Sequence, residues 1–148
     1  MLIAAVCTGN TCRSPMLERL LHRALNERGL VDFSVVSAGV AASDGDPASA
    51  HAITCMSDYG IDLSDHRSRH ISHLDLPRVQ LFITMSDRHA ALLRSLGVDA
   101  ERIVVAGEEE GIPDPFGGAI DDYKGAAQSL AQVAEDFAAA AEARKHSH

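Results

Sequence analysis

The chain has 148 residues, the usual size of one domain with a single sizeable hydrophobic core. Hydrophobic residues make up 46% and charged residues 23%, which is typical of a globular protein and excludes general disorder, and no apolar run approaches the length of a membrane span. The net charge of −8 argues against nucleic-acid binding, which depends on Lys and Arg to neutralise phosphates.

The start of the chain and its cysteines bear on the compartment. Met1–Val6 is shorter than a signal peptide and has no basic flank, so we expect a cytoplasmic protein. The three cysteines, Cys7, Cys12 and Cys55, are an odd number and do not resemble the framework of a secreted disulfide-bonded domain. We therefore expect free thiols in one domain that spans residues 1–148.

Short apolar runs and helical patterns alternate along the chain, with no internal repeat and no linker. The first apolar run is continuous, as expected for a strand buried on both faces. The segment after it carries leucines at helical spacing, with Pro15 near its start and Gly29 just past its end. In chain order we expect the strand Leu2–Val6, the helix Pro15–Arg28, the strand Phe33–Ser37, the helix Pro47–Tyr59, the strand Val79–Met85, the helix Asp87–Leu96, the strand Arg102–Val105, the loop Ala106–Ala119, and a last helix from Asp121 or Asp122 to about Arg144.

This alternation predicts an α/β fold. Strands separated by helices form a parallel sheet with right-handed crossovers and helices on both faces. Ligands of such sheets bind beyond the carboxyl ends of the strands. The loop after the first strand, Cys7–Pro15, is therefore the first place to look for chemistry.

That loop places a cysteine and an arginine six positions apart. Its Gly and Asn tolerate left-handed backbone conformations, so successive N–H groups can turn inward around an anion, beside the positive end of the following helix. Arg13 can grip two phosphoryl oxygens, and the positive surroundings favour Cys7 as a nucleophilic thiolate, with Ser14 donating a hydrogen bond to its sulfur. The residues expected to hold the phosphate are Thr8, Gly9, Asn10, Thr11 and Cys12.

A buried cysteine followed by an incidental Gly/Asn turn is the competing interpretation of this loop. A bare Cys-X5-Arg occurs easily by chance, but its position between a buried strand and a helix start favours the catalytic interpretation. The loop is not a Walker A motif, because the Gly-Lys-Ser/Thr ending is absent.

Val6–Met16 resembles the active-site signature of the low-molecular-weight protein phosphatases. The likeness covers essentially the whole chain in the family's order, and continues in Ser37-Ala38-Gly39, His66–Arg69, Thr84–Asp87 and Asp114–Gly118. The resemblance implies a four-stranded parallel sheet in the order 2-1-3-4. It also implies a phosphatase that acts on phosphorylated protein side chains through a phosphocysteine.

Such a reaction needs a proton donor opposite the nucleophile, first for the leaving atom and then, as a base, for the attacking water. Asp114 is stiffened by Pro113 and Pro115 in a Gly-rich loop, although these residues alone are also compatible with an ordinary turn. The resemblance implies that Asp114 is the general acid and base. It also implies that Phe116 lines the pocket wall, where the simpler alternative is a hydrophobic loop anchor.

The resemblance further implies that Asn10, Ser37 and His66 hydrogen-bond the phosphate loop and hold its strained shape. His66 and two later histidines, His70 and His73, are close enough in sequence to suggest a metal site. However, no Cys or carboxylate completes a zinc pattern, which favours hydrated surface histidines. We expect no metal and no cofactor, because the arginine and amides of the loop supply the positive charge that phosphoryl transfer requires.

Two interpretations of Cys12 stay open. A reversible disulfide with Cys7 would protect the nucleophile from irreversible oxidation, as the resemblance implies. Alternatively, Cys12 is a small apolar side chain beneath the loop. Cys55 falls on an expected helix and is interpreted as a core residue.

Thr11 bears on the choice of substrate. The resemblance is closest to the bacterial protein arginine phosphatases, which carry Thr at this position, whereas the tyrosine phosphatases usually carry a bulky aliphatic residue. A hydroxyl facing the pocket can accept a hydrogen bond from a guanidinium, worth about 0.5–1.5 kcal/mol, although Thr11 can instead satisfy only the loop backbone. We therefore expect phosphoarginine, with a strict phosphotyrosine phosphatase as the alternative. The acidic run Glu108–Glu110 is expected to favour basic peptides.

Two further functions compete with a phosphatase. A thiol-dependent arsenate reductase shares the Cys-X5-Arg loop but relays oxidation to a later cysteine pair, and only Cys55 lies beyond Cys12. A phosphate-binding module that has lost catalysis does not need to retain Cys7, Arg13, Ser14 and Asp114 together. The expected partners are therefore phosphorylated proteins, and neither nucleic acid nor a membrane.

Overall fold

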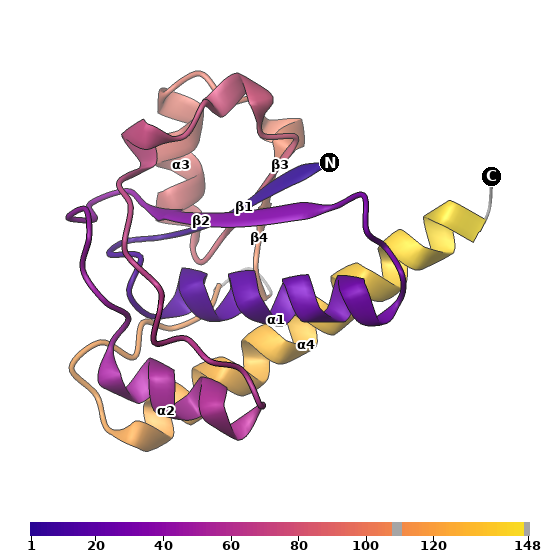
Figure 1. Ribbon diagram of the computed structural model, residues 1–148. Helices are drawn as coiled ribbons and strands as arrows, with labels where there is room; N and C mark the ends of the chain where they lie inside the picture. Colours follow the sequence, from indigo (N-terminus) through magenta and orange to yellow (C-terminus); the bar gives the residue numbers. More distant parts are fainter. Residues whose placement is uncertain (108–110, 147–148) are drawn as a thin grey trace.

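One parallel sheet organises the protein, which the computed structural model describes over residues 1–107 and 111–146. The sheet is confirmed as parallel, with the expected order β2-β1-β3-β4 (Figure 1). The register pairs Val6 with Ala38 on one side and with Thr84 on the other, so the carboxyl ends of these strands meet at one edge. The strands are β1 (Leu2–Cys7), β2 (Ser34–Gly39), β3 (Leu81–Thr84) and β4 (Ile103–Val105).

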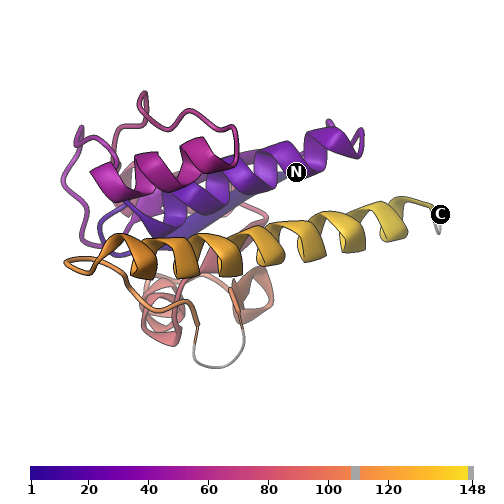
Figure 2. The same cartoon turned by 90° about the horizontal axis from the view of Figure 1, so that it is seen from below.

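Helices cover both faces of the sheet, as expected. Three of them, α1, α2 and α4, lie on one face, and α3 lies on the other (Figures 1 and 2). Within residues 1–107 and 111–146, no helix is long and apolar enough to cross a membrane. The helices are α1 (Arg13–Glu27), α2 (Ala50–Asp58), α3 (Asp87–Ser95) and α4 (Ile120–His146), with short 3-10 turns at η1 (Ile71–His73), η2 (Leu76–Arg78) and η3 (Ala100–Arg102).

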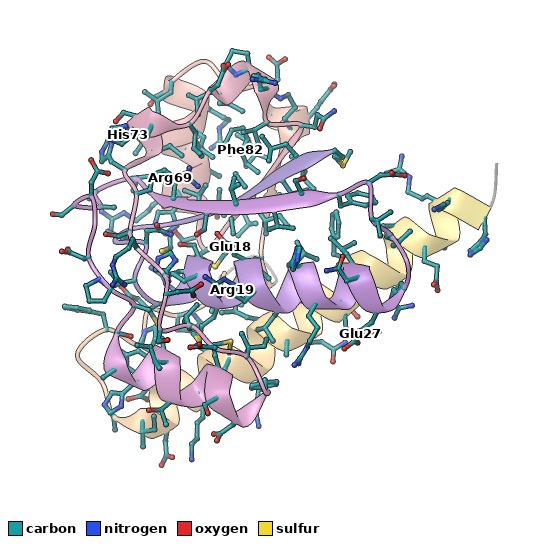
Figure 3. All side chains as sticks on the ribbon, viewed as in Figure 1. Glu18, Arg19, Glu27, Arg69, His73 and Phe82 are labelled. Carbon is teal, nitrogen blue, oxygen red and sulfur yellow. The ribbon has the colours of Figure 1, made fainter. Side chains whose placement is uncertain are left out.

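The first strand is apolar throughout because both of its faces are covered. Ile3 and Ala5 belong to the larger core cluster, which α1 and α4 complete. Ala4 and Val6 belong to the smaller cluster beneath α3, together with Phe82 on the α3 side of the sheet (Figure 3). This two-sided burial fixes β1 and, with it, the position of the residue at its carboxyl end.

The first helix begins two residues before the proline that the sequence pattern singles out. Pro15 is the third residue of α1, and its missing N–H is harmless there because amides of the first turn have no partner within the helix. Arg13 and Ser14 are therefore part of α1. Their side chains are held by a packed helix and not by a free loop. Gly29, just past the helix, has a φ of +72°, as its interpretation as a stop requires.

The second helix is shorter than the sequence pattern predicts and begins at Ala50. Pro47 pairs instead with Arg67 in an antiparallel bridge. Ser49 caps the helix, since its side chain accepts a hydrogen bond from the backbone N of Ala52. This bridge brings the segment after α2 back towards the carboxyl edge of the sheet.

Candidate active site

The cysteine of the phosphate-binding motif ends β1, and the arginine six positions later starts α1. Cys7 is buried, with 3% of its surface exposed. Its Sγ lies 2.9 Å from Ser14 Oγ and accepts a hydrogen bond from the backbone N of Asn10 at 3.3 Å. Donors aimed at a sulfur atom stabilise its thiolate form, which is the form that attacks phosphorus.

Asn10 braces the loop through both ends of its side chain. Its Nδ2 donates to Ser14 Oγ at 2.8 Å and to Ser37 Oγ at 2.9 Å, and its Oδ1 accepts from the backbone N of Arg69 at 2.8 Å. The carbonyl oxygen of Asn10 accepts from His66 Nε2 at 2.7 Å. Asn10 is fully buried and has a φ of 56°, so this network holds a left-handed residue within the loop.

The network also assigns the direction of the Ser14 hydroxyl. Because the Asn10 amide donates to Ser14 Oγ, the hydroxyl proton of Ser14 is left for an acceptor. Cys7 Sγ at 2.9 Å is much nearer than the carbonyl oxygen of Ala38 at 3.5 Å. We therefore assign the Ser14 hydroxyl as the donor to the sulfur.

Residue 39, at the end of β2, has to be a glycine because the backbone of the loop between β1 and α1 packs directly against it. A Cβ on this residue would lie 2.5 Å from the carbonyl oxygen of Thr8 and 2.8 Å from the backbone N of Asn10. The residues after it bond to the loop, since the N–H of Val40 donates to Cys7 and that of Ala41 to Thr8, both at 2.9 Å. Gly39 is the last residue of the motif Ser37-Ala38-Gly39, and this pattern alone predicts no role for it. Only the packing of two distant segments reveals one.

Arg13 and Asp114 meet across the mouth of the loop. Arg13 is buried, and its guanidinium donates to the carbonyl oxygen of Ile112 at 2.9 Å. A second guanidinium nitrogen lies 3.5 Å from Asp114 Oδ2, and the Asp114 side chain is 49% exposed. A buried cation and a half-exposed carboxylate thus face the same space.

That space is a hollow of about 600 Å³ at the carboxyl edge of the sheet. Residues from four separate segments line it, among them Thr8, Arg13, Ser86, Arg88, His89 and Asp114. Its polar lining includes two arginines, a histidine and one carboxylate. A phosphoryl group fits this chemistry, because Arg13 can pair with its oxygens while the carboxylate faces the leaving atom.

Several expected site residues lie elsewhere. Of the expected site residues, only Thr8, Arg13 and Asp114 line this hollow, whereas the buried Cys7 and also Gly9, Asn10, Thr11, Cys12, Ser14 and Phe116 are not among its lining residues. The Phe116 side chain is 78% exposed and borders a neighbouring hollow beyond Asp114, while its backbone N donates to Asp114 Oδ1 at 3.0 Å. The carbonyl oxygen of Thr11 accepts from the backbone N of Ser49 at 2.8 Å. The acidic run Glu108–Glu110 lies outside the described residues.

His89, in the first turn of α3, is a site residue that the sequence analysis did not single out. Its Nε2 lies 2.9 Å from Thr8 Oγ1, and its Nδ1 lies 3.1 Å from Ser86 Oγ. Burial, followed by the charges of Arg13 and Arg88, lowers the pKa of His89 to about 4. The imidazole is therefore neutral near pH 7. Its position two residues after the motif Thr84–Asp87 was the only feature of the sequence that could have indicated a role for His89.

All three cysteines are buried and free. Burial first, and then the charge of a Cys7 thiolate, raises the pKa of Cys12 to about 12. Burial likewise raises the pKa of Cys55. Cys12 is therefore a protonated, apolar thiol while Cys7 is reduced. The proposed disulfide between Cys7 and Cys12 stays a prediction.

His66 contacts the phosphate-binding loop, whereas His70 and His73 both contact Asp44. His66 bonds to the loop, whereas His73 Nε2 lies 2.7 Å from Asp44 Oδ2. The backbone N of His70 donates to Asp44 Oδ1 at 2.8 Å. Over the described part of the chain, no group of three or more His, Cys, Asp or Glu side chains is placed to hold a metal ion.

Comparison with known proteins places these features in a family. The low molecular weight phosphotyrosine protein phosphatases match residues 2–147 of the chain. The chain belongs to this family. It is therefore an enzyme of the hydrolase class, a cysteine-dependent protein phosphatase, and the identification made from its motifs is confirmed.

The family contains similar proteins with two different names. A protein-arginine-phosphatase of Bacillus subtilis (strain 168) is 34% identical over 142 residues, which are 92% of this chain and 93% of that protein. The low molecular weight protein-tyrosine-phosphatase Wzb of Salmonella typhi is 32% identical over 147 residues, which are 97% of this chain and 95% of that protein.

Solved structures of the family have the same fold. The YwlE arginine phosphatase from Geobacillus stearothermophilus matches with a TM-score of 0.88 and 31% identity, over 99% of this chain and 96% of its own. A YwlE arginine phosphatase mutant with a phosphorylated active-site serine matches with a TM-score of 0.86 and 33% identity, over 93% of each chain.

Proposed function

We propose that this phosphatase hydrolyses phosphoarginine in proteins, with Cys7 as the nucleophile and Asp114 as the general acid and base. The surroundings of Cys7 Sγ carry the proposal, because Ser14 Oγ at 2.9 Å and the backbone N of Asn10 at 3.3 Å both point donors at the sulfur. A structural relative with a phosphorylated serine in its active site supports a covalent phosphoenzyme. The whole chain, residues 1–148, acts as one phosphatase domain.

In the first step the Cys7 thiolate attacks phosphorus and forms a P–S bond, while the bond from phosphorus to the leaving nitrogen breaks. The leaving nitrogen takes a proton from Asp114, which becomes a carboxylate. Arg13 pairs with the phosphoryl oxygens, and the loop amides, expected from Thr8 to Cys12, add further donors.

In the second step a water molecule attacks the phosphocysteine. Asp114, now a carboxylate, accepts the proton of that water. The P–S bond breaks, phosphate leaves, and the electron pair returns to Cys7. The Ser14 hydroxyl, 2.9 Å from the sulfur, stabilises the departing thiolate.

Arg13 and Asp114 lie close enough to act on the same phosphoryl group. A guanidinium nitrogen of Arg13 is 3.5 Å from Asp114 Oδ2, and the Asp114 side chain is half exposed. Arg13 can therefore pair with the phosphoryl oxygens while Asp114 faces the leaving nitrogen.

Phosphoarginine is proposed over phosphotyrosine on two grounds. The Bacillus subtilis relative, similar over 92% of the chain, is named a protein-arginine-phosphatase, and its identity of 34% is comparable to the 32% of the tyrosine phosphatase Wzb. Thr11, in the phosphate-binding loop but outside the lining of the hollow, is the second ground, because its hydroxyl can accept a hydrogen bond from a guanidinium whereas an aliphatic side chain cannot. A strict phosphotyrosine phosphatase is the second candidate, supported by the name of the Salmonella typhi relative.

The test is phosphate release from two peptides that differ only in carrying phosphoarginine or phosphotyrosine. We expect wild type to have the higher kcat/KM on phosphoarginine and Thr11→Ile to reverse the preference. A wild-type preference for phosphotyrosine would replace the first candidate by the second and leave Thr11 a structural residue. Cys7→Ser should release no phosphate from either peptide, and full activity in this variant would overturn the mechanism.

The proposed setting is the cytoplasm, with phosphorylated proteins as substrates. The three free thiols fit a reducing compartment, where cysteines stay reduced and a thiolate nucleophile is protected.

A further inference from the structure

A short chain of three polar side chains leads from the start of α3 to the phosphate-binding loop. Ser86 caps α3, and its Oγ lies 3.1 Å from Nδ1 of His89. On the other side of the ring, Nε2 lies 2.9 Å from Thr8 Oγ1. Thr8 directly follows Cys7, and all three residues of this relay line the hollow that also holds Arg13 and Asp114.

The proton positions in this relay follow from a count of donors and acceptors. The backbone N–H of His89 donates to Ser86 Oγ at 3.5 Å, and His89 Nδ1 is the one acceptor among the described residues within hydrogen-bond distance of the Ser86 hydroxyl. When that hydroxyl donates to Nδ1, the single proton of a neutral imidazole is on Nε2 and is donated to Thr8 Oγ1. In the opposite arrangement no described protein atom accepts the hydroxyl proton of Ser86.

This assignment fixes the direction of the Thr8 hydroxyl. With one lone pair used by Nε2–H, the Thr8 O–H points away from His89. Thr8 is an exposed residue at the rim of the hollow, so its free proton faces the space where the phosphoryl group is expected. We propose that His89 is a positioning residue that turns the Thr8 hydroxyl into a donor for a phosphoryl oxygen of the substrate.

The inference rests on the proposed function, since it gives the relay a phosphoryl group to bind. The neutrality of the ring supports it. Burial and the cations Arg13 and Arg88 disfavour a second proton on His89, and Asp114 favours one less strongly. A doubly protonated ring would donate from Nδ1 as well and would reverse the Ser86 hydroxyl.

Histidine is suited to this contact by its reach. Its two ring nitrogens bridge Ser86 and Thr8 from one rigid side chain on α3. A Gln amide extends about as far as Nε2 and can still donate to Thr8, whereas an Asn amide extends only about as far as Nδ1. The pair His89→Gln and His89→Asn therefore separates the donated hydrogen bond from the general effect of replacing a buried ring.

The experiment measures kcat and KM on a phosphopeptide that wild type hydrolyses. Thr8→Val and His89→Ala should each lower kcat/KM about tenfold, the effect of one hydrogen bond to a charged group. The double variant should lose no more than either single variant, because both remove the same interaction. His89→Gln should stay within about threefold of wild type and His89→Asn should behave like His89→Ala.

The opposite results are equally clear. Losses that multiply to about a hundredfold in the double variant, or full activity in Thr8→Val, would overturn the inference. If the His89 variants fail to fold, as judged by thermal unfolding, Thr8→Ser against Thr8→Val decides. Serine keeps the hydroxyl and should keep the activity, while equal losses in both would refute the role of that hydroxyl.

Binding of inorganic phosphate, measured by calorimetry, keeps this inference separate from the proposed function. Binding does not require turnover, so Thr8→Val and His89→Ala should each weaken the affinity for phosphate about tenfold even if no peptide is hydrolysed. An inactive wild type with this pattern would refute the proposed function alone. Unchanged phosphate affinity in both variants, with an active wild type, would refute the relay alone.

Discussion

The two segments that face the hollow are held in opposite ways. In the loop between β1 and α1, Asn10 is fully buried and its polar groups contact Cys7, Ser14, Ser37, Arg69 and His66. In the segment after β4, Asp114 is half exposed and contacts only Arg13 and the backbone N of Phe116 among the described residues. The phosphate-binding loop is thus held in one conformation by its own hydrogen bonds, whereas the side chain of the proton donor can change its conformation.

This difference matches the two tasks. The phosphoryl group binds in one orientation, so hydrogen-bond donors that are already in position stabilise the transition state most strongly. A proton donor has to follow the leaving atom and then a water molecule, whose positions differ. Substitutions in the loop should therefore change both stability and activity, whereas substitutions at Asp114 should change activity alone.

The largest expected effect is that of Asn10→Ala. It removes the donors to Ser14 and Ser37 and the acceptor for Arg69, and puts Ala at a φ of 56°. We expect kcat/KM to fall on the order of a thousandfold and the free energy of unfolding to fall by about 3 kcal/mol, as for a broken buried network. Steady-state kinetics and urea unfolding measure the two changes.

Asn10→Gly is the matched control, because Gly adopts this φ without strain. It should recover about 1–2 kcal/mol of the stability lost in Asn10→Ala and little of the activity. Equal stability of the two variants would mean that the backbone of the loop relaxes to another conformation.

The next largest effect is expected for Asp114→Asn, which tests whether the half-exposed carboxylate contributes to activity without contributing to stability. We expect kcat/KM to fall about a hundredfold or more, the usual contribution of a general acid and base. The free energy of unfolding should change by less than about 1 kcal/mol, since Asp114 is half exposed and the buried Arg13 keeps its hydrogen bond to the carbonyl oxygen of Ile112. An aryl phosphate with an electron-poor leaving group needs less protonation and should lose less activity. An equal loss on both substrates would argue against proton donation by Asp114.

A third prediction concerns the support beneath the loop. In Gly39→Ala the new Cβ would lie 2.5 Å from the carbonyl oxygen of Thr8, so loop and strand must separate. We expect a loss of about 2–3 kcal/mol in the free energy of unfolding, as in other overpacked cores. Gly125→Ala, on α4 with nothing within 4 Å of its Cβ, is the control and should gain about 0.5–1 kcal/mol. An unchanged free energy of unfolding in Gly39→Ala would show that the loop does not pack closely against β2.

How much of this could be read from the sequence depends on the range of the contact. The strand order came from a family resemblance, and the position of the loop with Cys7, Arg13 and Ser14 between the first strand and the first helix came from local patterns. The contacts of Gly39 with Asn10 and of His89 with Thr8 could not be derived in this way, because they join residues 29 and 81 positions apart. Both helix starts were misplaced, since Pro15 is the third residue of α1 and Pro47 lies before the cap of α2 in a bridge to Arg67.

The last expected effect is the pH dependence that His89 adds to stability, which is close to zero at pH 7 and grows only as the pH falls. Its pKa is lowered to about 4 in the folded protein, from 6.5 for an unperturbed histidine. Between these values the unfolded chain binds a proton that the folded protein does not, so stability falls as the pH drops from 6.5 and the loss is complete near 4. The contribution amounts to at most about 3 kcal/mol.

Carboxylates also titrate in this range, so wild type has to be compared with His89→Gln, which lacks the titrating ring. The free energy of unfolding of wild type should fall more steeply than that of the variant between pH 6.5 and 4. Parallel curves would mean that the ring takes up its proton at the same pH in the folded protein as in the unfolded chain. Below that pH His89 would donate from both nitrogens, so Nε2 would still donate to Thr8 and only the hydroxyl of Ser86 would be reversed.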